Sequence, residues 1–176
     1  DSNYYSKFCN LYYSLLKKCP DFHIFCFVLD EFKISNEILK SSKISIFYLK
    51  DLENEYPELF YAKKNRTKVE YYFTLTPFIL RYIFKNINLS QLSYIDSDLY
   101  FYNDPTTVYD RYSKENYNIL LTEHNNNKIQ AKYGKYNVGW LEFKKTDETM
   151  NCLYEWSQDC VNWCYDEVVN DKFADQ

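Results

Sequence analysis

The segment "SYIDSDLYFYNDP" (93–105) places two aspartates, Asp96 and Asp98, directly after a short apolar run. The run predicts a buried strand, and a strand that ends in D-x-D can aim two carboxylates at one hard cation. Mg²⁺ and Mn²⁺ prefer such oxygen ligands. A chain this rich in acids is expected to contain about one D-x-D by chance, with its acids solvated in a turn. The tripeptide alone therefore leaves a metal site and a solvated turn equally open.

The segments on either side of this run predict the fold class. Further apolar runs predict strands over 22–30, 44–49, 92–96, 117–123 and 136–144. Apolar residues at helical spacing predict helices over 6–19, 35–42, 53–61, 66–85 and 146–169. We expect Ser35, and Thr146 or Asp147, to cap two of these helices, and Pro77 to kink or restart another. The order β-α-β-α-β-α-β-β-α indicates an α/β sheet with helices on both faces.

The polar residues that follow the strands are the next feature. Ligands in such folds bind at the carboxyl ends of the strands. Asp30, Asp96 and Glu123 each follow an apolar strand, so the sequence predicts that they lie near that edge. The segments 103–116 and 124–135 read as polar connectors. Without a repeat or a linker, the 176 residues predict a single domain over 1–176.

Composition excludes several classes of function. The formal net charge of −4 argues against a nucleic-acid binder, which would need a basic face, but it allows an anionic ligand held through a metal ion. The six cysteines form no C-x-x-C pair, which argues against zinc. The spacing of Cys160 and Cys164 favours buried free thiols on one helix face, as in a reduced setting. No apolar run approaches transmembrane length, so we expect a cytoplasmic protein, or one peripheral at the inner face of the membrane.

Four segments together resemble a known family. "YIDSDLYFYNDP" resembles the D-x-D segment of nucleotide-sugar glycosyltransferases of the GT-A fold, and is most similar to the glycosyltransferase family 8 type. "DSNY" (1–4) resembles the D-x-N-Y that opens the first helix, "YNVGW" (136–140) the N-x-G strand, and "ADQ" (174–176) the D-Q pair. The segments occur in the family's order and cover almost the whole chain. The resemblance implies a GT-A (Rossmann-like), mixed and mostly parallel sheet flanked by helices on both faces.

The resemblance implies a role for each motif at the donor nucleotide. Asp96 and Asp98 would hold Mn²⁺ or Mg²⁺, and Asp96 would also touch the ribose. Asp1, Asn3 and Tyr4 would contact the uracil and ribose of a UDP-sugar. The implied activity is metal-dependent transfer of a hexosyl group from a UDP-sugar, or another nucleotide-sugar, to an acceptor hydroxyl.

The resemblance also implies the groups at the sugar. Asn137 and Gly139 would lie against the transferred sugar, and Asp175 and Gln176 would hold its hydroxyls and position it for attack. The family retains the anomeric configuration. The acceptor would be a glycan, a lipid-linked glycan or a protein, as in polysaccharide assembly.

The chain departs from the family pattern at three places. The family's third metal ligand is a His downstream of D-Q, and His124 comes too early to match it. The family has Arg or Lys on the helix before D-x-D, where this chain has Thr74 and Thr76, so Arg66 is the basic candidate for a nucleotide contact. The family's first strand would precede Asp1. We therefore expect the chain to be a fragment, truncated at both ends.

Two other readings stay open. A haloacid-dehalogenase-like phosphatase also places D-x-D after a strand, and would use Asp96 and Asp98 in catalysis. That family usually has Thr or Val after the second Asp, where this chain has Leu99. A non-catalytic glycosyltransferase-like module that binds a sugar or a partner is the second reading.

Overall fold

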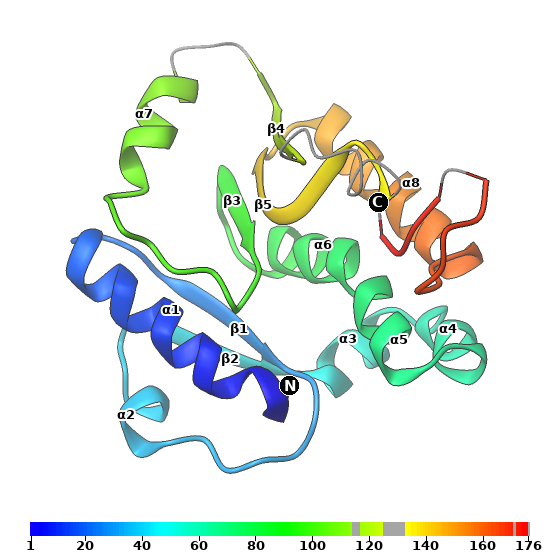
Figure 1. Ribbon diagram of the computed structural model, residues 1–176, viewed down its shortest axis with the longest axis horizontal. Coiled ribbons are helices and arrows are strands. Elements are labelled where there is room, and N and C mark those ends of the chain that lie inside the picture. The colour runs from blue at the N-terminus through cyan, green and yellow to red at the C-terminus, as the bar shows by residue number, and fades with distance from the viewer. Residues whose placement is uncertain (114–116, 125–132, 171, 176) are drawn as a thin grey trace. The chain divides into compact units, whose positions relative to one another are not determined.

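The computed structural model describes residues 1–113, 117–124, 133–170 and 172–175 (Figure 1). Contacts divide the chain into two compact units. Unit 1 comprises Asp1–Leu49 and Ile95–Tyr117, and unit 2 comprises Lys50–Tyr94 and Asn118–Gln176. The chain therefore passes from one unit to the other three times. The prediction of a single transferase domain stays a prediction.

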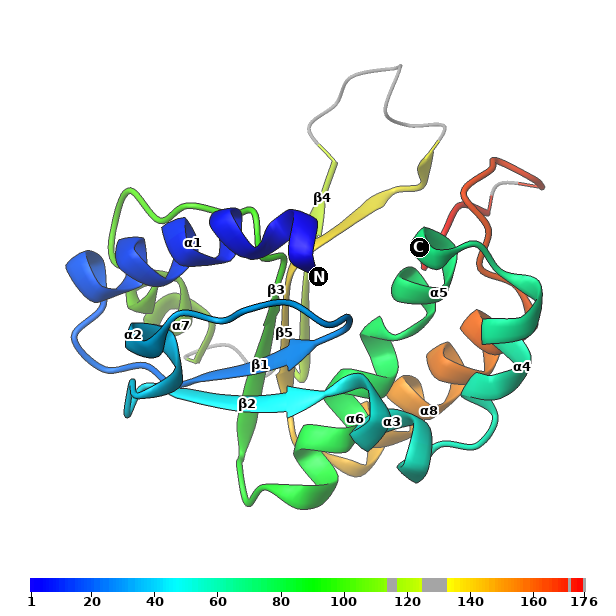
Figure 2. The ribbon, with the colours of Figure 1, turned by 90° about the horizontal axis from the view of Figure 1, so that it is seen from below.

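Unit 1 is built on two parallel strands, β1 (Ile24–Val28) and β2 (Ile44–Tyr48). Helix α1 (Tyr5–Lys18) lies along one face of this pair (Figures 1 and 2). Its buried face includes Phe8 and Tyr12, which pack with alternate residues of both strands. The predicted helix and both strands are confirmed here, because one apolar helix stripe meets one apolar sheet face.

Three shorter elements complete unit 1: η1 (Ser2–Tyr4), α2 (Asn36–Leu39) and α7 (Thr106–Ser113). Ser35 caps α2 as predicted, and its hydroxyl accepts a hydrogen bond from the Ile38 amide at 3.4 Å. The helix α7 was not predicted, since its segment was interpreted as a polar connector. The D-P pair before it is a helix start, with an Asp104 carboxylate oxygen accepting from the Thr106 amide at 2.9 Å.

Unit 2 contains a three-stranded sheet in the order β3 (Gln91–Ile95), β5 (Tyr136–Lys144) and β4 (Ile119–Glu123). β5 runs antiparallel to β4. It also runs antiparallel to β3, because the amide that follows its end, Lys145, donates to the carbonyl of Ser90 just before β3 begins. All three predicted strands are confirmed.

Five helices accompany this sheet: α3 (Leu49–Glu55), α4 (Leu59–Asn65), α5 (Lys68–Thr74), α6 (Thr76–Asn86) and α8 (Asp147–Asn162). Helices α6 and α8 pack on one face of the sheet. Their shared core consists of Leu80, Phe84, Leu141, Phe143 and Leu153. The apolar stripes of both helices therefore account for the burial of one side of β5.

A mixed α/β architecture is confirmed, but one mostly parallel sheet is not seen among the described strands. They form a parallel pair and an antiparallel trio. In the trio, β4 and β5 are consecutive along the chain and pair as antiparallel strands. Sequence periodicity identifies a strand and carries no information on its direction.

Two helix boundaries were predicted wrongly, each for a local reason. The helix expected over 53–61 is split between α3 and α4, because Pro57 disfavours helical backbone in the residue before it. The last helix begins as predicted, with Thr146 accepting from the Thr149 amide, but ends at Asn162 rather than near 169. The restart at Pro77 is confirmed, since the proline lies in the first turn of α6.

The early end of α8 changes the interpretation of its cysteines. Cys164 lies beyond the helix, so it does not share a helix face with Cys160 as predicted. Both are nevertheless buried, and all six cysteines are free thiols. A hydrogen bond with Cys164, together with burial, raises the pKa of the Cys160 thiol well above its ordinary value. Cys160 is therefore poorly suited to act as a nucleophile at neutral pH.

The start of α5 gives a prediction about pH. Glu70 completes a capping box, since its carboxylate accepts from the Thr67 amide at 2.7 Å and from the Asp166 amide at 3.1 Å. The Thr67 amide is the main cause of the lowered pKa of Glu70. This stabilisation is complete above the ordinary carboxyl pKa and is lost as the pH falls through the lowered pKa of the folded state.

We therefore expect wild-type protein to lose more stability on acidification than Glu70→Gln, as measured by urea unfolding at a series of pH values from neutral to acidic. Glu155→Gln, at an exposed position, is the control, and its stability should depend on pH as that of wild type does. Identical pH profiles for wild type and Glu70→Gln would contradict the assignment.

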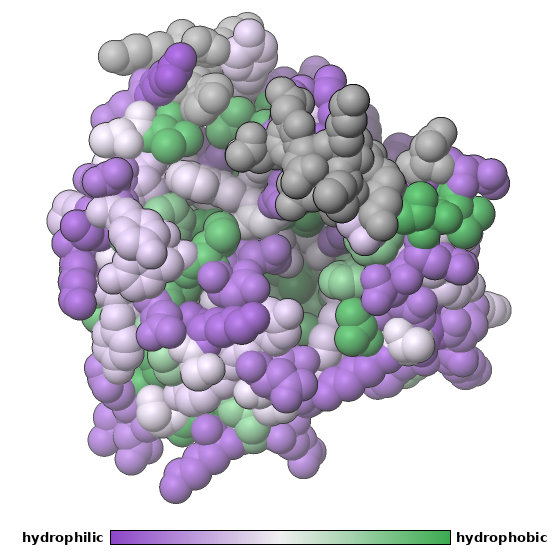
Figure 3. Space-filling view, viewed as in Figure 1, coloured by the Kyte–Doolittle hydropathy of each residue, from purple (hydrophilic) through white to green (hydrophobic). Residues whose placement is uncertain are grey.

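The surface accommodates the aromatic bias of the sequence. The face in Figure 3 is mostly hydrophilic, and its hydrophobic residues form small separate areas. Many of the large exposed hydrophobic residues are tyrosines, which keep their hydroxyls in water. Within the described ranges, no helix combines the length and apolar composition needed to cross a bilayer.

Candidate functional site

The N-terminal segment that resembles D-x-N-Y forms one turn ahead of α1. The Asp1 carboxylate caps this turn, with Oδ1 accepting from the Tyr4 amide at 3.1 Å. Asn3 is exposed, and Tyr4 is also exposed, to 42%. The motif therefore folds as a capped turn with two exposed polar side chains available to a ligand.

Asp30, at the carboxyl end of β1, holds this turn in place. Its Oδ1 accepts from the Ser2 amide at 2.8 Å, and its Oδ2 accepts from the Ser2 hydroxyl at 2.9 Å. Both carboxylate oxygens are thus used in fixing the backbone that carries Asn3 and Tyr4. Glu123, the other acid predicted at a strand end outside D-x-D, forms an exposed ion pair with Lys135 at 3.3 Å.

The D-x-D segment forms a tight turn at the end of β3. The Leu99 amide donates to the carbonyl oxygen of Asp96 at 3.1 Å, which closes the turn around Asp98. The side chain of Asp98 is 40% exposed, and Asp96 is partly buried. One strand end thus carries two carboxylates one residue apart, as the sequence predicts.

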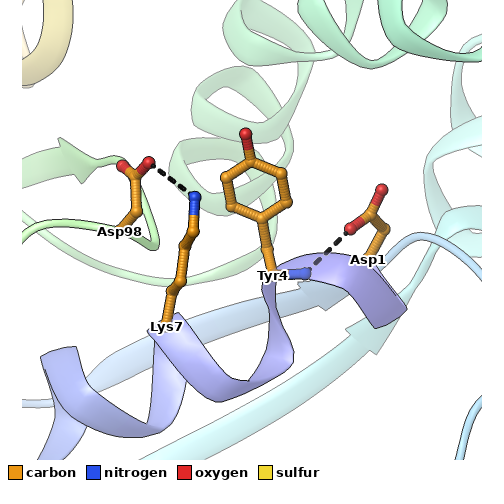
Figure 4. A network of polar contacts seen from close by, with 4 residues as sticks. All are labelled: Asp1, Tyr4, Lys7 and Asp98. Atoms are coloured by element: carbon orange, nitrogen blue, oxygen red, sulfur yellow. Dashed lines mark hydrogen bonds and ion pairs between the residues drawn. The ribbon is translucent and has the colours of Figure 1, made fainter.

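A lysine from α1 meets the second carboxylate. The Nζ atom of Lys7 lies 3.4 Å from Oδ2 of Asp98 and 4.1 Å from the centroid of the Tyr4 ring (Figure 4). Lys7 and Asp98 are 91 residues apart along the chain, so this lysine joins the D-x-N-Y turn and the D-x-D turn within unit 1. Sequence reasoning missed Lys7, although its position three residues after Tyr4 puts both on one side of the helix.

The residues of this turn fit a divalent cation that is shared with a ligand. Mg²⁺ and similar hard cations are commonly bound through one or two carboxylates plus substrate phosphates. Asp96 and Asp98 supply such a pair, and Asp98 already faces a positive charge. Among the described residues, no group of three His, Cys, Asp or Glu side chains could hold a metal ion.

The N-x-G motif lies at a bulge in β5. Pairing with β4 slips between Leu121 and Thr122, so that β5 has extra residues around Gly139. The Oδ1 atom of Asn137 accepts from the Gly139 amide at 2.7 Å, and Gly139 is buried while Asn137 is exposed. Bulges re-aim side chains, and Gly139 has no side chain to limit how closely another group approaches its backbone.

Asp175 of the D-Q pair is held by two residues of unit 2. The hydroxyl of Thr76 donates to its Oδ2 at 2.8 Å, and Nε1 of Trp156 donates to its carbonyl oxygen at 2.8 Å. Thr76 is buried at the start of α6. Gln176 lies outside the described residues. Sequence reasoning also missed the contact of Thr76 with Asp175. The one local signal for Thr76 was the T-x-T pattern directly before Pro77.

Arg66 has a packing role in the structure. Its guanidinium donates to the carbonyls of Val161 and Cys164 and to the hydroxyl of Tyr165, and it stacks on the Tyr165 ring at 3.9 Å. These bonds satisfy carbonyls at and just beyond the end of α8, where the last carbonyls of a helix have no partner within the helix. The predicted nucleotide contact of Arg66 stays a prediction.

Comparisons with known proteins add relatives without an assigned activity. The chain is 28% identical over 180 residues to a Bacillus subtilis (strain 168) protein named "Uncharacterized protein YfnD", and 29% identical over 179 residues to "Uncharacterized protein YfnF" of the same strain. These matches cover 97% and 94% of this chain, and 56% and 57% of the relatives. The chain thus spans little more than half the length of either relative. No protein-family model matches it.

Proposed function

We propose that the chain is the donor-binding part of a metal-dependent glycosyltransferase of the GT-A fold, which transfers a sugar from UDP to an acceptor hydroxyl with retention. The observation that carries this proposal is the contact between Lys7 and Asp98. Because Lys7 also lies over the Tyr4 ring, it links the two segments that resemble a nucleoside site and a metal site.

In the proposed reaction, the chain's residues bind and orient the donor. Asp96 and Asp98 hold the cation, and the exposed Asn3 and Tyr4 contact the nucleoside. When bound, the cation supplies positive charge that stabilises the departing UDP. Asn137 and Asp175 orient the sugar. The acceptor hydroxyl attacks the anomeric carbon from the face that UDP leaves, the bond from that carbon to the diphosphate oxygen breaks, and the hydroxyl proton passes to the departing diphosphate.

Isothermal titration of the full-length protein with UDP, with and without Mn²⁺, tests the proposal. We expect binding in the presence of Mn²⁺ with a dissociation constant between about 1 μM and 1 mM, a range typical of enzyme substrates. Chelation with EDTA should abolish this binding. Equal UDP affinity in the presence and absence of Mn²⁺ would contradict the proposed site.

Two further measurements separate the rival functions. Metal-dependent hydrolysis of an aryl phosphate, without UDP binding, would favour a phosphatase that uses the same two aspartates. Failure to bind UDP or to hydrolyse the ester would favour a non-catalytic module. Sugar release from a UDP-sugar panel would then identify the donor.

The contact at Asp175 gives a prediction about turnover. Thr76→Val keeps the shape of a buried side chain but removes its hydrogen bond to Oδ2. We expect kcat for donor hydrolysis to fall by about tenfold, which corresponds to one ordinary hydrogen bond. Metal-dependent UDP affinity should not change, because Asp175 is proposed to act on the sugar.

Thr74→Val is the matched control. Thr74 is also buried, but its hydroxyl donates to the Glu70 carbonyl within the helix. This variant should retain kcat. Equal losses of kcat in both variants would show that Thr76 acts through folding rather than by positioning Asp175.

A further inference from the structure

Lys7 is a cation in an electrostatically unusual position. It lies in the first turn of α1, where the helix dipole is positive and where the sequence provides no acidic residue. A lysine is disfavoured there unless an anion compensates, because cations are stabilised at the opposite end of a helix. The compensating anion in the structure is Asp98, at 3.4 Å from Nζ.

The positive helix end and the ammonium of Lys7 together favour an anion beside the D-x-D turn. The Lys7–Asp98 pair itself is weak, because both side chains are about half exposed, at 47% and 40%. A lysine on a flexible stem can therefore leave Asp98 at low cost. A diphosphate at the turn offers more negative charge than the single carboxylate.

Other candidates for a phosphate contact are engaged elsewhere. The guanidinium of Arg66 is bonded to carbonyls at the end of α8. Thr76 donates its hydroxyl to Asp175, and Thr74 donates its hydroxyl within its own helix. Lys7, in contrast, is exposed and already lies at the carboxylate that would hold the cation.

We propose that Lys7 binds the diphosphate of the donor, exchanging Asp98 for a phosphate oxygen when a divalent cation occupies Asp98. This inference rests on the proposed function. Lys7 bonds Oδ2 of Asp98, and a divalent cation held by the same carboxylate would repel the ammonium group and favour its release. The released ammonium then neutralises part of the charge on the diphosphate.

The test compares Lys7→Met with Lys17→Met in the full-length protein. Both variants remove one lysine from α1, and Lys17 lies in its last turn. Three affinities are measured: Mn²⁺ alone by electron paramagnetic resonance, UDP at saturating Mn²⁺ by calorimetry, and uridine by NMR titration. Uridine shares the nucleoside with UDP but lacks its diphosphate.

We expect Lys7→Met to weaken UDP binding by about tenfold to a hundredfold, as for the loss of a hydrogen bond to a charged group. Uridine affinity should stay at the wild-type value, and Mn²⁺ affinity should rise because the competing ammonium is gone. Lys17→Met should match wild type in all three, and Lys7→Arg should recover part of the UDP affinity.

Each contrary result has a distinct meaning. Equal UDP affinities of Lys7→Met and Lys17→Met, in a protein whose wild type binds UDP through Mn²⁺, would overturn this inference and leave the proposed function standing. Equal losses for uridine and UDP would also overturn it, because Lys7 would then support the nucleoside turn. Absence of Mn²⁺-dependent UDP binding in wild type would overturn both proposals.

Discussion

Asp98→Asn should reduce Mn²⁺-dependent UDP affinity by at least about a hundredfold, because it removes one of only two carboxylates proposed to hold the cation. The amide keeps the size of the side chain, and the residue is 40% exposed. The variant should therefore fold normally, with a change in unfolding free energy within about 0.5 kcal/mol. Calorimetric titration with UDP at several Mn²⁺ concentrations measures the loss.

Asp21→Asn is the matched control for Asp98→Asn. It makes the same substitution at an exposed aspartate of unit 1 and should leave UDP affinity unchanged. If Asp98→Asn binds UDP and Mn²⁺ like the control, then the acids of the segment 93–105 are solvated in a turn and hold no metal ion. Donor hydrolysis by the same variants provides a second readout.

Phe84→Ala should destabilise unit 2 by about 3–5 kcal/mol, the cost of removing a buried phenylalanine from a packed core. The side chain of Phe84 is fully buried among Leu80, Leu141, Phe143 and Leu153. Intrinsic tryptophan fluorescence follows this unit specifically during urea unfolding, since all three tryptophans belong to it.

Phe60→Ala removes the same atoms from an exposed position of α4 and serves as the control. Its side chain is 48% exposed, so the unfolding free energy should change by about 0.5 kcal/mol at most. A similar small loss for Phe84→Ala would mean that the packing of α6 and α8 on β5 contributes little to stability.

Local elements were predictable because the signals for them are local. The apolar stripe of α1, the Ser35 cap and the restart at Pro77 each depend on residues within one or two turns. The direction of β5 and the end of α8 were not predictable. The first depends on which strand is its neighbour. At the second, the carbonyl of Val161 accepts from Arg66, 95 residues away, a contact that no local pattern indicates.

The candidate site shows the same division between local and long-range signals. The turn that carries Asp96 and Asp98, and the bond within Asn137–Gly139, follow from short motifs. Lys7 and Thr76 became candidates only through contacts with Asp98 and Asp175, 91 and 99 residues away. A single sequence contains no measure of such distances, so a motif identifies its own residues but not the partners that orient them.

The threefold crossing of the chain between its units has a consequence for synthesis on the ribosome. The first part of unit 1 ends at Leu49, and the part that carries Asp98 begins only at Ile95. Since compact units fold as wholes, β1, β2 and α1 must emerge and wait while 45 residues of the other unit follow. Nascent chains stalled within this interval should expose the unfinished unit to chaperones. A recombinant chain cut after any residue from 50 to 116 gives no fragment that contains either unit complete.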